Sequence, residues 1–291
     1  EKTMKTSLPN ELELDLMTPS EVAILREWAV SEGWNPGISD IDIARAYDPD
    51  AFIALRRGGE LLGGGSIFSY EGICGFMGLF IMRQDQRQQG LGNVLWQHRL
   101  NRLRDRLRSD ALVGMDGVLH MVPYYSRGGF EYLYEDVRFQ GEAAGHASVH
   151  CRPMAAEDFT DIMALDRSCF PCDRSGFLKR WLSAPGMKTA VLKDGDNLEA
   201  FAALRPAEKG VKFGPVLAHT PSGAREVVSH LMSAVQGELV QLDVPEVNKK
   251  AVALAASFGL EDVFRCAKMY LGAQPTLEMN RVFGLTSFEF G

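Results

Sequence analysis

Residues 78–107, GLFIMRQDQRQQGLGNVLWQHRLNRLRDRL, decide the fold of this chain. The apolar run at residues 73–82 is bounded by polar residues, as a buried strand is. A polar loop follows at residues 83–92, and from Asn93 onward apolar residues recur at steps of three and four, which predicts a helix. The first-turn amides of such a helix lack partners and carry the positive end of its dipole. We therefore expect a phosphorylated compound to bind at this loop.

The glycines of the loop distinguish between kinds of phosphate site. Residues 90–95, GLGNVL, place Leu95 where a dinucleotide-binding fingerprint needs its third glycine, and the Gly-Lys-Ser or Gly-Lys-Thr of a Walker loop is absent here. These departures disfavour a nucleotide-binding enzyme. A glycine-containing helix start without any ligand stays open as the simplest alternative.

The pattern Arg-x-x-Gly-x-Gly, from Arg87 to Gly92, resembles the acyl-CoA loop of the Gcn5-related N-acetyltransferase (GNAT) superfamily. The resemblance implies that acetyl-CoA is the co-substrate. It implies that the strand backbone pairs with the pantetheine arm and that the loop and helix start hold the pyrophosphate. These roles fall on Phe80, Ile81 and Met82 for the arm, and on Arg87, Gln88, Gln89, Gly90, Leu91, Gly92 and Asn93 for the pyrophosphate.

A second motif, Tyr125-Ser-Arg-Gly-Gly-Phe130, also resembles the superfamily, in which a tyrosine often precedes Gly-Phe at the end of the last helix. The resemblance makes Tyr125 the general acid. Acyl transfer needs such a group, because the departing CoA sulfur must receive a proton. The alternative is a tyrosine packed under the sheet, as we expect for Tyr124.

The general base is harder to assign. Many GNAT enzymes place a carboxylate on the strand before the loop, and residues 73–82 contain none. The remaining candidates are a chain of water molecules, Glu71, Asp116, or His120, which precedes the predicted Tyr125 helix. We carry His120 forward as the catalytic candidate, with a purely structural histidine as its alternative.

The turn Trp34-Asn35-Pro36-Gly37 separates two predicted helices, where the superfamily shapes its acceptor pocket. Trp34 and Asn35 are therefore candidate substrate contacts, by cation–π interaction and hydrogen bonding. The alternative is a rigid turn whose Trp34 side chain packs in the hydrophobic core and contacts no substrate. With the segment Arg-Val-Phe-Gly at residues 281–284, this turn resembles a bacterial subgroup of two-domain GNAT proteins.

Composition restricts the partners of the protein. A net charge of −7 disfavours a nucleic-acid coat, so we expect the arginines at the end of the long helix to form a solvated face: Arg99, Arg102, Arg104, Arg106 and Arg108. No apolar run has membrane-spanning length, and no signal-peptide core is visible. Five cysteines form no disulfide framework pattern, and the Cys169/Cys172 pair lacks a second pair for zinc. We expect a cytoplasmic monomer or homodimer that binds neither nucleic acid, membrane nor metal.

The 291 residues suit two domains. Residues 1–140 predict the order β-α-α-β-β-β-α-β-α-β, residues 141–147 a small flexible linker, and residues 148–291 a repeat of that order. The repeat begins with a strand at 148–153 and ends with one at 279–290. We expect an α+β fold of two tandem GNAT-like domains, each a mixed, mostly antiparallel sheet flanked by helices.

The second half lacks both motifs. Pro221 removes an amide from its equivalent loop, and Ala255 stands where Tyr125 would. We therefore expect a degenerate domain that supports the first half and closes its acceptor pocket. The function predicted for the whole chain is transfer of an acetyl group to a primary amine of a small molecule, by direct attack in a ternary complex. The alternative is a non-catalytic or regulatory acyl-CoA-binding protein.

Overall fold

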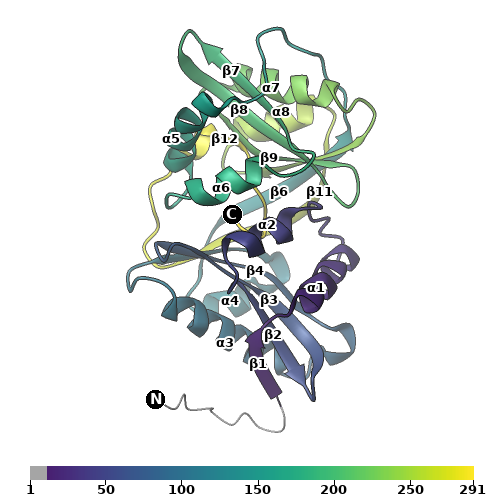
Figure 1. Cartoon of the computed structure of the whole chain (residues 1–291), viewed down its shortest axis with the longest axis vertical. Helices are drawn as coiled ribbons and strands as arrows, with labels where there is room; N and C mark the ends of the chain where they lie inside the picture. Colours follow the sequence, from purple (N-terminus) through teal and green to yellow (C-terminus); the bar gives the residue numbers. More distant parts are fainter. Residues whose placement is uncertain (1–11) are drawn as a thin grey trace.

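The computed structural model of the protein describes residues 12–291, which form two halves stacked along the long axis of the molecule (Figure 1). The first half contains β1 (Leu12–Leu16), α1 (Pro19–Ser31), α2 (Asp40–Tyr47), β2 (Phe52–Arg57), β3 (Glu60–Tyr70), β4 (Cys74–Met82), α3 (Leu91–Asp105), β5 (Leu112–Val118), α4 (Val122–Arg127) and β6 (Glu131–Glu142). The second contains α5 (Phe159–Cys169), α6 (Ser175–Leu182), β7 (Lys188–Asp194), β8 (Asn197–Pro206), β9 (Val211–Ala218), α7 (Pro221–Ser233), β10 (Leu239–Pro245), α8 (Lys249–Ser257), β11 (Glu261–Leu271) and β12 (Val282–Gly284). Four short 3-10 helices lie at Gln84–Gln86 (η1), Leu119–Met121 (η2), Ala156–Asp158 (η3) and Met279–Arg281 (η4).

The predicted order of the first half is confirmed, whereas the strand predicted at residues 148–153 is wrong. The Ser148 side chain there donates to Glu226 and accepts from the His150 amide, which turns the backbone. Val149 is 94% exposed, and only Arg152 forms a single bridge, to Val191. Residues 148–153 therefore form a turn and a single bridge instead of a strand.

The strands of residues 12–291 form one twelve-stranded sheet, in the order β1-β2-β3-β4-β5-β11-β6-β10-β9-β8-β7, with β12 paired to β9. The halves exchange their last long strands. β11, from the second half, lies between β5 and β6, and β6, from the first half, lies between β11 and β10. This joins the two expected sheets into one. The ladder partners of the exchanged strands lie 97 or more residues away in the sequence, so local sequence patterns did not reveal them.

Period-two alternation along the strands divides the first half into two layers. Phe52 and Ala54 of β2 pack in the apolar cluster with α1 and α2, while Ile53 and Leu55 pack in the cluster with α3. The cluster on the α1 side continues into α5 and α6 of the second half. Helix α1 begins with a capping box between Thr18 and Glu21 and with Pro19 in its first turn.

Residues 285–291 leave β12 and run between the two halves, where the end of the chain lies in Figure 1. The Tyr70 hydroxyl donates to the Phe290 carbonyl (2.6 Å), and Arg174 Nη1 donates to the Gly291 carbonyl (2.7 Å). The end of the chain thus contacts both halves. The strand predicted over residues 279–290 is reduced to β12, because the Ser287 hydroxyl accepts from the Glu289 and Phe290 amides and turns the backbone.

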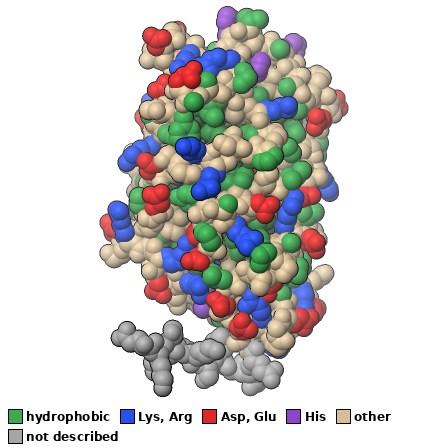
Figure 2. Space-filling view, viewed as in Figure 1, with side chains coloured by type: hydrophobic (Ala, Val, Ile, Leu, Met, Phe, Trp, Pro, Cys, Tyr) green, Lys and Arg blue, Asp and Glu red, His purple; other side chains and the backbone are tan. Residues whose placement is uncertain are grey.

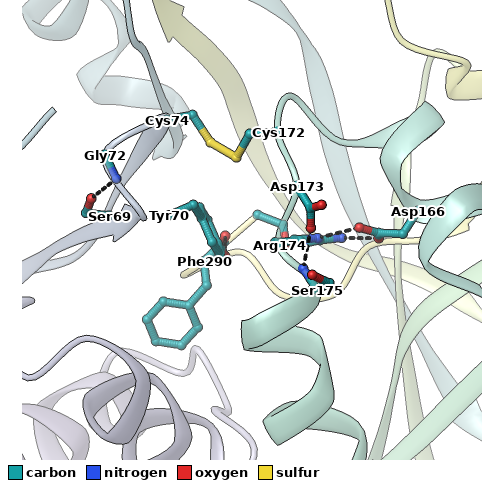
Figure 3. Close-up of a disulfide and its surroundings, with 11 residues drawn as sticks. Ser69, Tyr70, Gly72, Cys74, Asp166, Cys172, Asp173, Arg174, Ser175 and Phe290 are labelled. Carbon is teal, nitrogen blue, oxygen red and sulfur yellow. Dashed lines mark hydrogen bonds and ion pairs between the residues drawn. A yellow bond between two sulfur atoms is a disulfide. The ribbon is translucent and has the colours of Figure 1, made fainter. Parts of the chain in front are cut away.

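A disulfide joins β4 to the second half, between Cys74 and Cys172 (Figure 3). The cysteine spacing had indicated no such pair, since the two residues are 98 apart in the sequence. Cys172 is thereby removed from the Cys169/Cys172 pair considered above. Beside the disulfide, Arg174 forms a buried bidentate ion pair with Asp166 that fixes the loop carrying Cys172 (Figure 3).

Charged side chains of both signs are interspersed over the face shown in Figure 2, and neither sign forms a continuous patch there. Within residues 12–291, no helix has the length and apolar character needed to cross a membrane.

Candidate functional site

The parallel strands β4 and β5 separate partway along their length. They pair only at residues 74–77 of β4 and 112–115 of β5. Leu79 has a positive φ of 49°, and the β3–β4 register shifts between Gly64 and Ser66, so β4 carries a bulge at this point. Residues 78–82 consequently have no ladder partner on the β5 side within the described chain.

A cavity of about 70 Å³ occupies the gap. Part of its lining belongs to the α3 face of the sheet, including Trp96, Met115 and Tyr125. Another part belongs to the α1 face, including Trp34, Phe264 and Phe288. The cavity therefore connects the two faces of the sheet through the gap between β4 and β5.

Tyr125, the predicted acid, lies on this cavity. Helix α4 presents it, its ring packs on Trp96 with centroids 4.9 Å apart, and a Cβ at Gly117 would lie 2.6 Å from that ring. Its hydroxyl has no hydrogen-bond partner among residues 12–291. Burial raises the pKa of Tyr125 to about 12, and the positive charge of Arg99 partly opposes this rise.

Arg99 is fully buried at the same cavity, so its assignment to a solvated face was wrong. Its Nη2 donates to the carbonyls of Ser66 (2.6 Å) and Gly78 (2.7 Å), which lie beside the bulge. Its Nε and Nη1 have no partner in the described chain. Burial lowers the pKa of Arg99 to about 9. Spacing could have revealed this position, because residue 99 lies three after Trp96 and four before Leu103, on one helical stripe.

Two buried carboxylates and a lysine meet beneath the cavity. Lys268 of the exchanged strand β11 lies 2.8 Å from Asp116 and 3.3 Å from Asp136. Burial raises the pKa of Asp116 and of Asp136, and Lys268 opposes the rise. Burial lowers the pKa of Lys268, but Asp116 and Asp136 outweigh this and raise it well above its ordinary value. Asp116 lines the cavity, and its Oδ1 has no partner among residues 12–291.

The predicted anion loop lies at the exposed start of α3. Gly90 is the N-cap, with a φ of 79° and no side-chain cap, and the amides of Leu91 and Gly92 have no partner in the described chain. A Cβ at Gly90 would meet no atom within 4 Å, so the backbone there is open to a ligand.

The side chains around the loop hold its shape. Arg87 donates to the Met82 carbonyl and pairs with Glu32, and Gln89 donates to the Asp85 carbonyl. Gln88 has a left-handed φ of 62°, and Asn93 accepts a hydrogen bond from Tyr124. Of the strand residues assigned to the pantetheine arm, Phe80 lines the cavity, while Ile81 and Met82 are buried beside it. The hydrogen bonds of Arg87 tie its side chain to the end of β4 and to Glu32, which follows α1.

The two proposed substrate residues lie in different surroundings. Trp34 lines the cavity, and its carbonyl accepts from Arg138 (2.6 Å). Asn35 lies outside the lining, because its side chain donates to Gln241 and to the Lys209 carbonyl and accepts from the Lys209 amide. The Asn35 amide thus joins the turn to the second half.

Of the candidate bases, only Asp116 reaches the cavity. His120 is exposed on η2, and Glu71 is exposed in the β3–β4 turn; both lie outside the lining.

Comparison with known proteins gives matches in both halves. A sequence profile described as "Acetyltransferase (GNAT) family" matches residues 19–130, and one described as "Acetyltransferase (GNAT) domain" matches residues 162–284. Together these matches span most of the chain. The chain belongs to the GNAT superfamily. It is a two-domain member in which the α3 loop and Tyr125 lie in the first domain.

Relatives of this GNAT protein extend over its full length. It is 25% identical over 289 residues to the holothin acyltransferase of a Pseudoalteromonas species, covering 98% of this chain and 94% of the relative. A candidate acetyltransferase from Pyrococcus horikoshii superposes with a TM-score of 0.82 at 18% identity, covering 100% of this chain and 99% of the other. A tandem GNAT protein from the clavulanic acid biosynthesis pathway superposes with a TM-score of 0.64 at 14% sequence identity. The match covers 91% of this chain and 99% of the other. The two structures show a shared fold.

The second GNAT domain has no corresponding gap. β9 and β10 also pair only briefly, at residues 211–212 and 240–241, but β12 pairs with β9 beyond that point and the Leu285 amide donates to the Asp243 carbonyl (2.8 Å). The Thr220 side chain caps α7 by accepting from Gly223. Ala255 is buried. In the second half, β12 and the residue that follows it therefore occupy the space that corresponds to the open gap between β4 and β5 in the first half.

Several cavity residues could not be found from the sequence motifs. Arg138, Phe264, Phe288 and Glu289 reach the cavity through the exchanged strands and the 285–291 segment. Lys268 reaches Asp116 in the same way. No local pattern marks these residues, because long-range pairing of β6 and β11 and the path of the 285–291 segment bring them to the cavity.

Proposed function

We propose that the first domain transfers an acetyl group from acetyl-CoA to the primary amine of a small molecule. The observation that carries this proposal is the cavity through the sheet, which brings Tyr125 together with the unpartnered Arg99 Nε and Nη1 and Asp116 Oδ1. The full-length similarity to a protein named holothin acyltransferase supports acyl transfer in this chain.

The two faces of the sheet suit the two substrates. The open α3 start and the unpaired edge of β4 lead to the Tyr125 side of the cavity, which suits the phosphates and the extended arm of CoA. Trp34 and Phe288 line the opposite side, where the acceptor would enter. Acetyl-CoA, as a substrate, supplies an activated thioester, so the chain itself needs no nucleophile.

Each unpartnered side chain has a role in this reaction. Asp116 Oδ1 takes the proton that the amine loses as the new C–N bond forms, and its raised pKa makes it a stronger base. Tyr125 gives its hydroxyl proton to the sulfur as the C–S bond breaks. Arg99 favours the negative charge that develops on the sulfur and on the tyrosine oxygen, because a buried unpaired cation acts over a short range in a low dielectric.

Thermal-shift titration with acetyl-CoA, combined with a CoA thiol-release assay over a panel of primary amines, tests the proposal. A ligand present at 100 times its Kd stabilises the native state by about 2.7 kcal/mol. We expect a shift for the intact protein and none for Gly90→Glu, whose carboxylate would repel the phosphates. Gly259→Glu is the matched control, because Gly259 also has a positive φ (73°) and a Cβ there would meet no atom within 4 Å.

The combined results of the two assays distinguish acetyl transfer from acyl-CoA binding without catalysis. A shift with thiol release supports acetyl transfer. A shift without thiol release for any amine favours the non-catalytic acyl-CoA-binding alternative, and the absence of a shift contradicts both.

A further inference from the structure

The unpartnered polar atoms differ between the two sides of the cavity. On the α3 side they are donors, the Arg99 Nε and Nη1 groups. On the opposite side they are carboxylate acceptors, Asp116 Oδ1 and Glu289 Oε2. Buried polar groups are nearly always paired, and an unpaired one costs the full desolvation penalty. A ligand that completes the acceptor side must therefore bring hydrogen-bond donors, which the N–H groups of an amine supply.

Glu289 is held firmly in the 285–291 segment. It is 5% exposed and follows Ser287, whose hydroxyl accepts the Glu289 amide at 3.2 Å. The next residue, Phe290, is fixed by the Tyr70 hydroxyl. A Cβ at Gly78 would overlap the Glu289 carbonyl oxygen, so the segment runs directly against β4 beside the bulge. Glu289 thus lies next to the point where β4 leaves β5.

The cations near Glu289 already have partners. Arg138 donates twice to Asp243, at 2.7 and 2.8 Å, and once to the Trp34 carbonyl. Lys212 lies 3.7 Å from Asp243 and donates to the Asn35 carbonyl. No ion pair within 4 Å involves Glu289 in the described chain. Its carboxylate therefore keeps the capacity to accept a hydrogen bond from a charged ligand nitrogen.

We propose that Glu289 binds a second, positively charged nitrogen of the acceptor, so that the acceptor class is small diamines and related amines with two nearby nitrogens. This inference rests on the proposed function. The attacking nitrogen must be uncharged and gives its proton to Asp116, so it is distinct from the cation at Glu289. The cavity volume of about 70 Å³ restricts the two nitrogens to a short separation.

The test measures kcat/KM with acetyl-CoA and three acceptors: 1,3-diaminopropane, propylamine and hydroxylamine, which is uncharged at neutral pH. We expect the intact protein to prefer the diamine over propylamine by about 10- to 100-fold, as a charge-assisted hydrogen bond gives. Glu289→Gln should lose this preference while keeping its turnover of propylamine and hydroxylamine and its thermal shift with acetyl-CoA. Glu238→Gln, at an exposed glutamate, should behave as the intact protein.

Three results would overturn parts of this reasoning. If the intact protein turns over propylamine as well as the diamine, or if Glu289→Gln keeps the preference, the role of Glu289 is wrong and the proposed acetyl transfer stands. If acetyl-CoA binds but none of the three acceptors and no amine of the wider panel releases CoA, the acetyl transfer fails as well.

Discussion

Replacing Lys268 by Met tests the exchanged strand, because β11 brings this cation to the two buried carboxylates of the first half. Lys268 is 4% exposed, so its removal leaves Asp116 and Asp136 buried beside an apolar side chain. Breaking a buried ion pair from one side costs about 3–5 kcal/mol. At about 2–4 °C per kcal/mol, the expected fall in Tm at pH 7 is about 6–20 °C.

The loss of stability in Lys268→Met should increase as the pH rises. The pKa values of Asp116 and Asp136 are raised in the folded state, so the folded protein binds more protons than the unfolded chain above the unfolded value of about 3.9. Stability is therefore lost as pH rises through the folded pKa values. Removing Lys268 raises them further, so Lys268→Met should be close to the intact protein near pH 4 and weakest at neutral pH.

Differential scanning calorimetry between pH 4 and pH 8 checks this expectation. Lys188→Met is the matched control, since Lys188 is an exposed strand lysine in β7. Adding Asp116→Asn and Asp136→Asn to Lys268→Met should recover much of the loss, because no buried charge then remains. A loss equal to that of Lys188→Met, or one that does not change with pH, would refute the reasoning.

Two further changes probe the site and the junction between the halves. Tyr125→Phe should lower kcat by about 10²–10⁴-fold without altering acetyl-CoA binding. Full activity of this variant in the thiol-release assay would place the proton donor elsewhere. Tyr132→Phe, on the exposed part of β6, is the control. Asn35→Ala removes three hydrogen bonds to the second half from a residue with a left-handed φ, and should cost about 2–4 kcal/mol in urea unfolding. The exposed Asn101→Ala should cost nothing, and an equally small loss at Asn35 would show that its hydrogen bonds add no net stability.

Much of the fold follows from local sequence patterns. The strand before the loop, predicted at residues 73–82, is β4 at Cys74–Met82, and the helix predicted from Asn93 is α3. These elements have a clear hydrophobic periodicity and are bounded by polar residues and glycines, and both signals depend on only a few neighbouring residues. The exchange of β6 and β11 was not predictable in this way, because a strand's own pattern shows which face is buried but not which partner it pairs with.

The site was predictable only where a motif marked it. Tyr125 and Phe80, which the resemblance had marked, line the cavity, and Asp116 was one of several candidate bases; their roles stay predictions. Arg99 was misread because charged residues are usually exposed, although its helical spacing placed it with Trp96. Glu289 and Lys268 had no local signal at all, since Glu289 reaches the cavity, and Lys268 reaches Asp116, across the junction of the two halves.

The exchanged strands also affect how the protein is made on the ribosome. The first half leaves the ribosome with the edge of β5 exposed, since its neighbour β11 begins only at Glu261. At about 5–20 residues per second, the interval between the synthesis of β5 and of β11 is about 7–30 s. During that interval the nascent first half presents an unpaired apolar strand, which is a site for wrong pairing with other chains. The cavity that Tyr125 and Asp116 share therefore acquires its final wall only when nearly the whole chain has been translated.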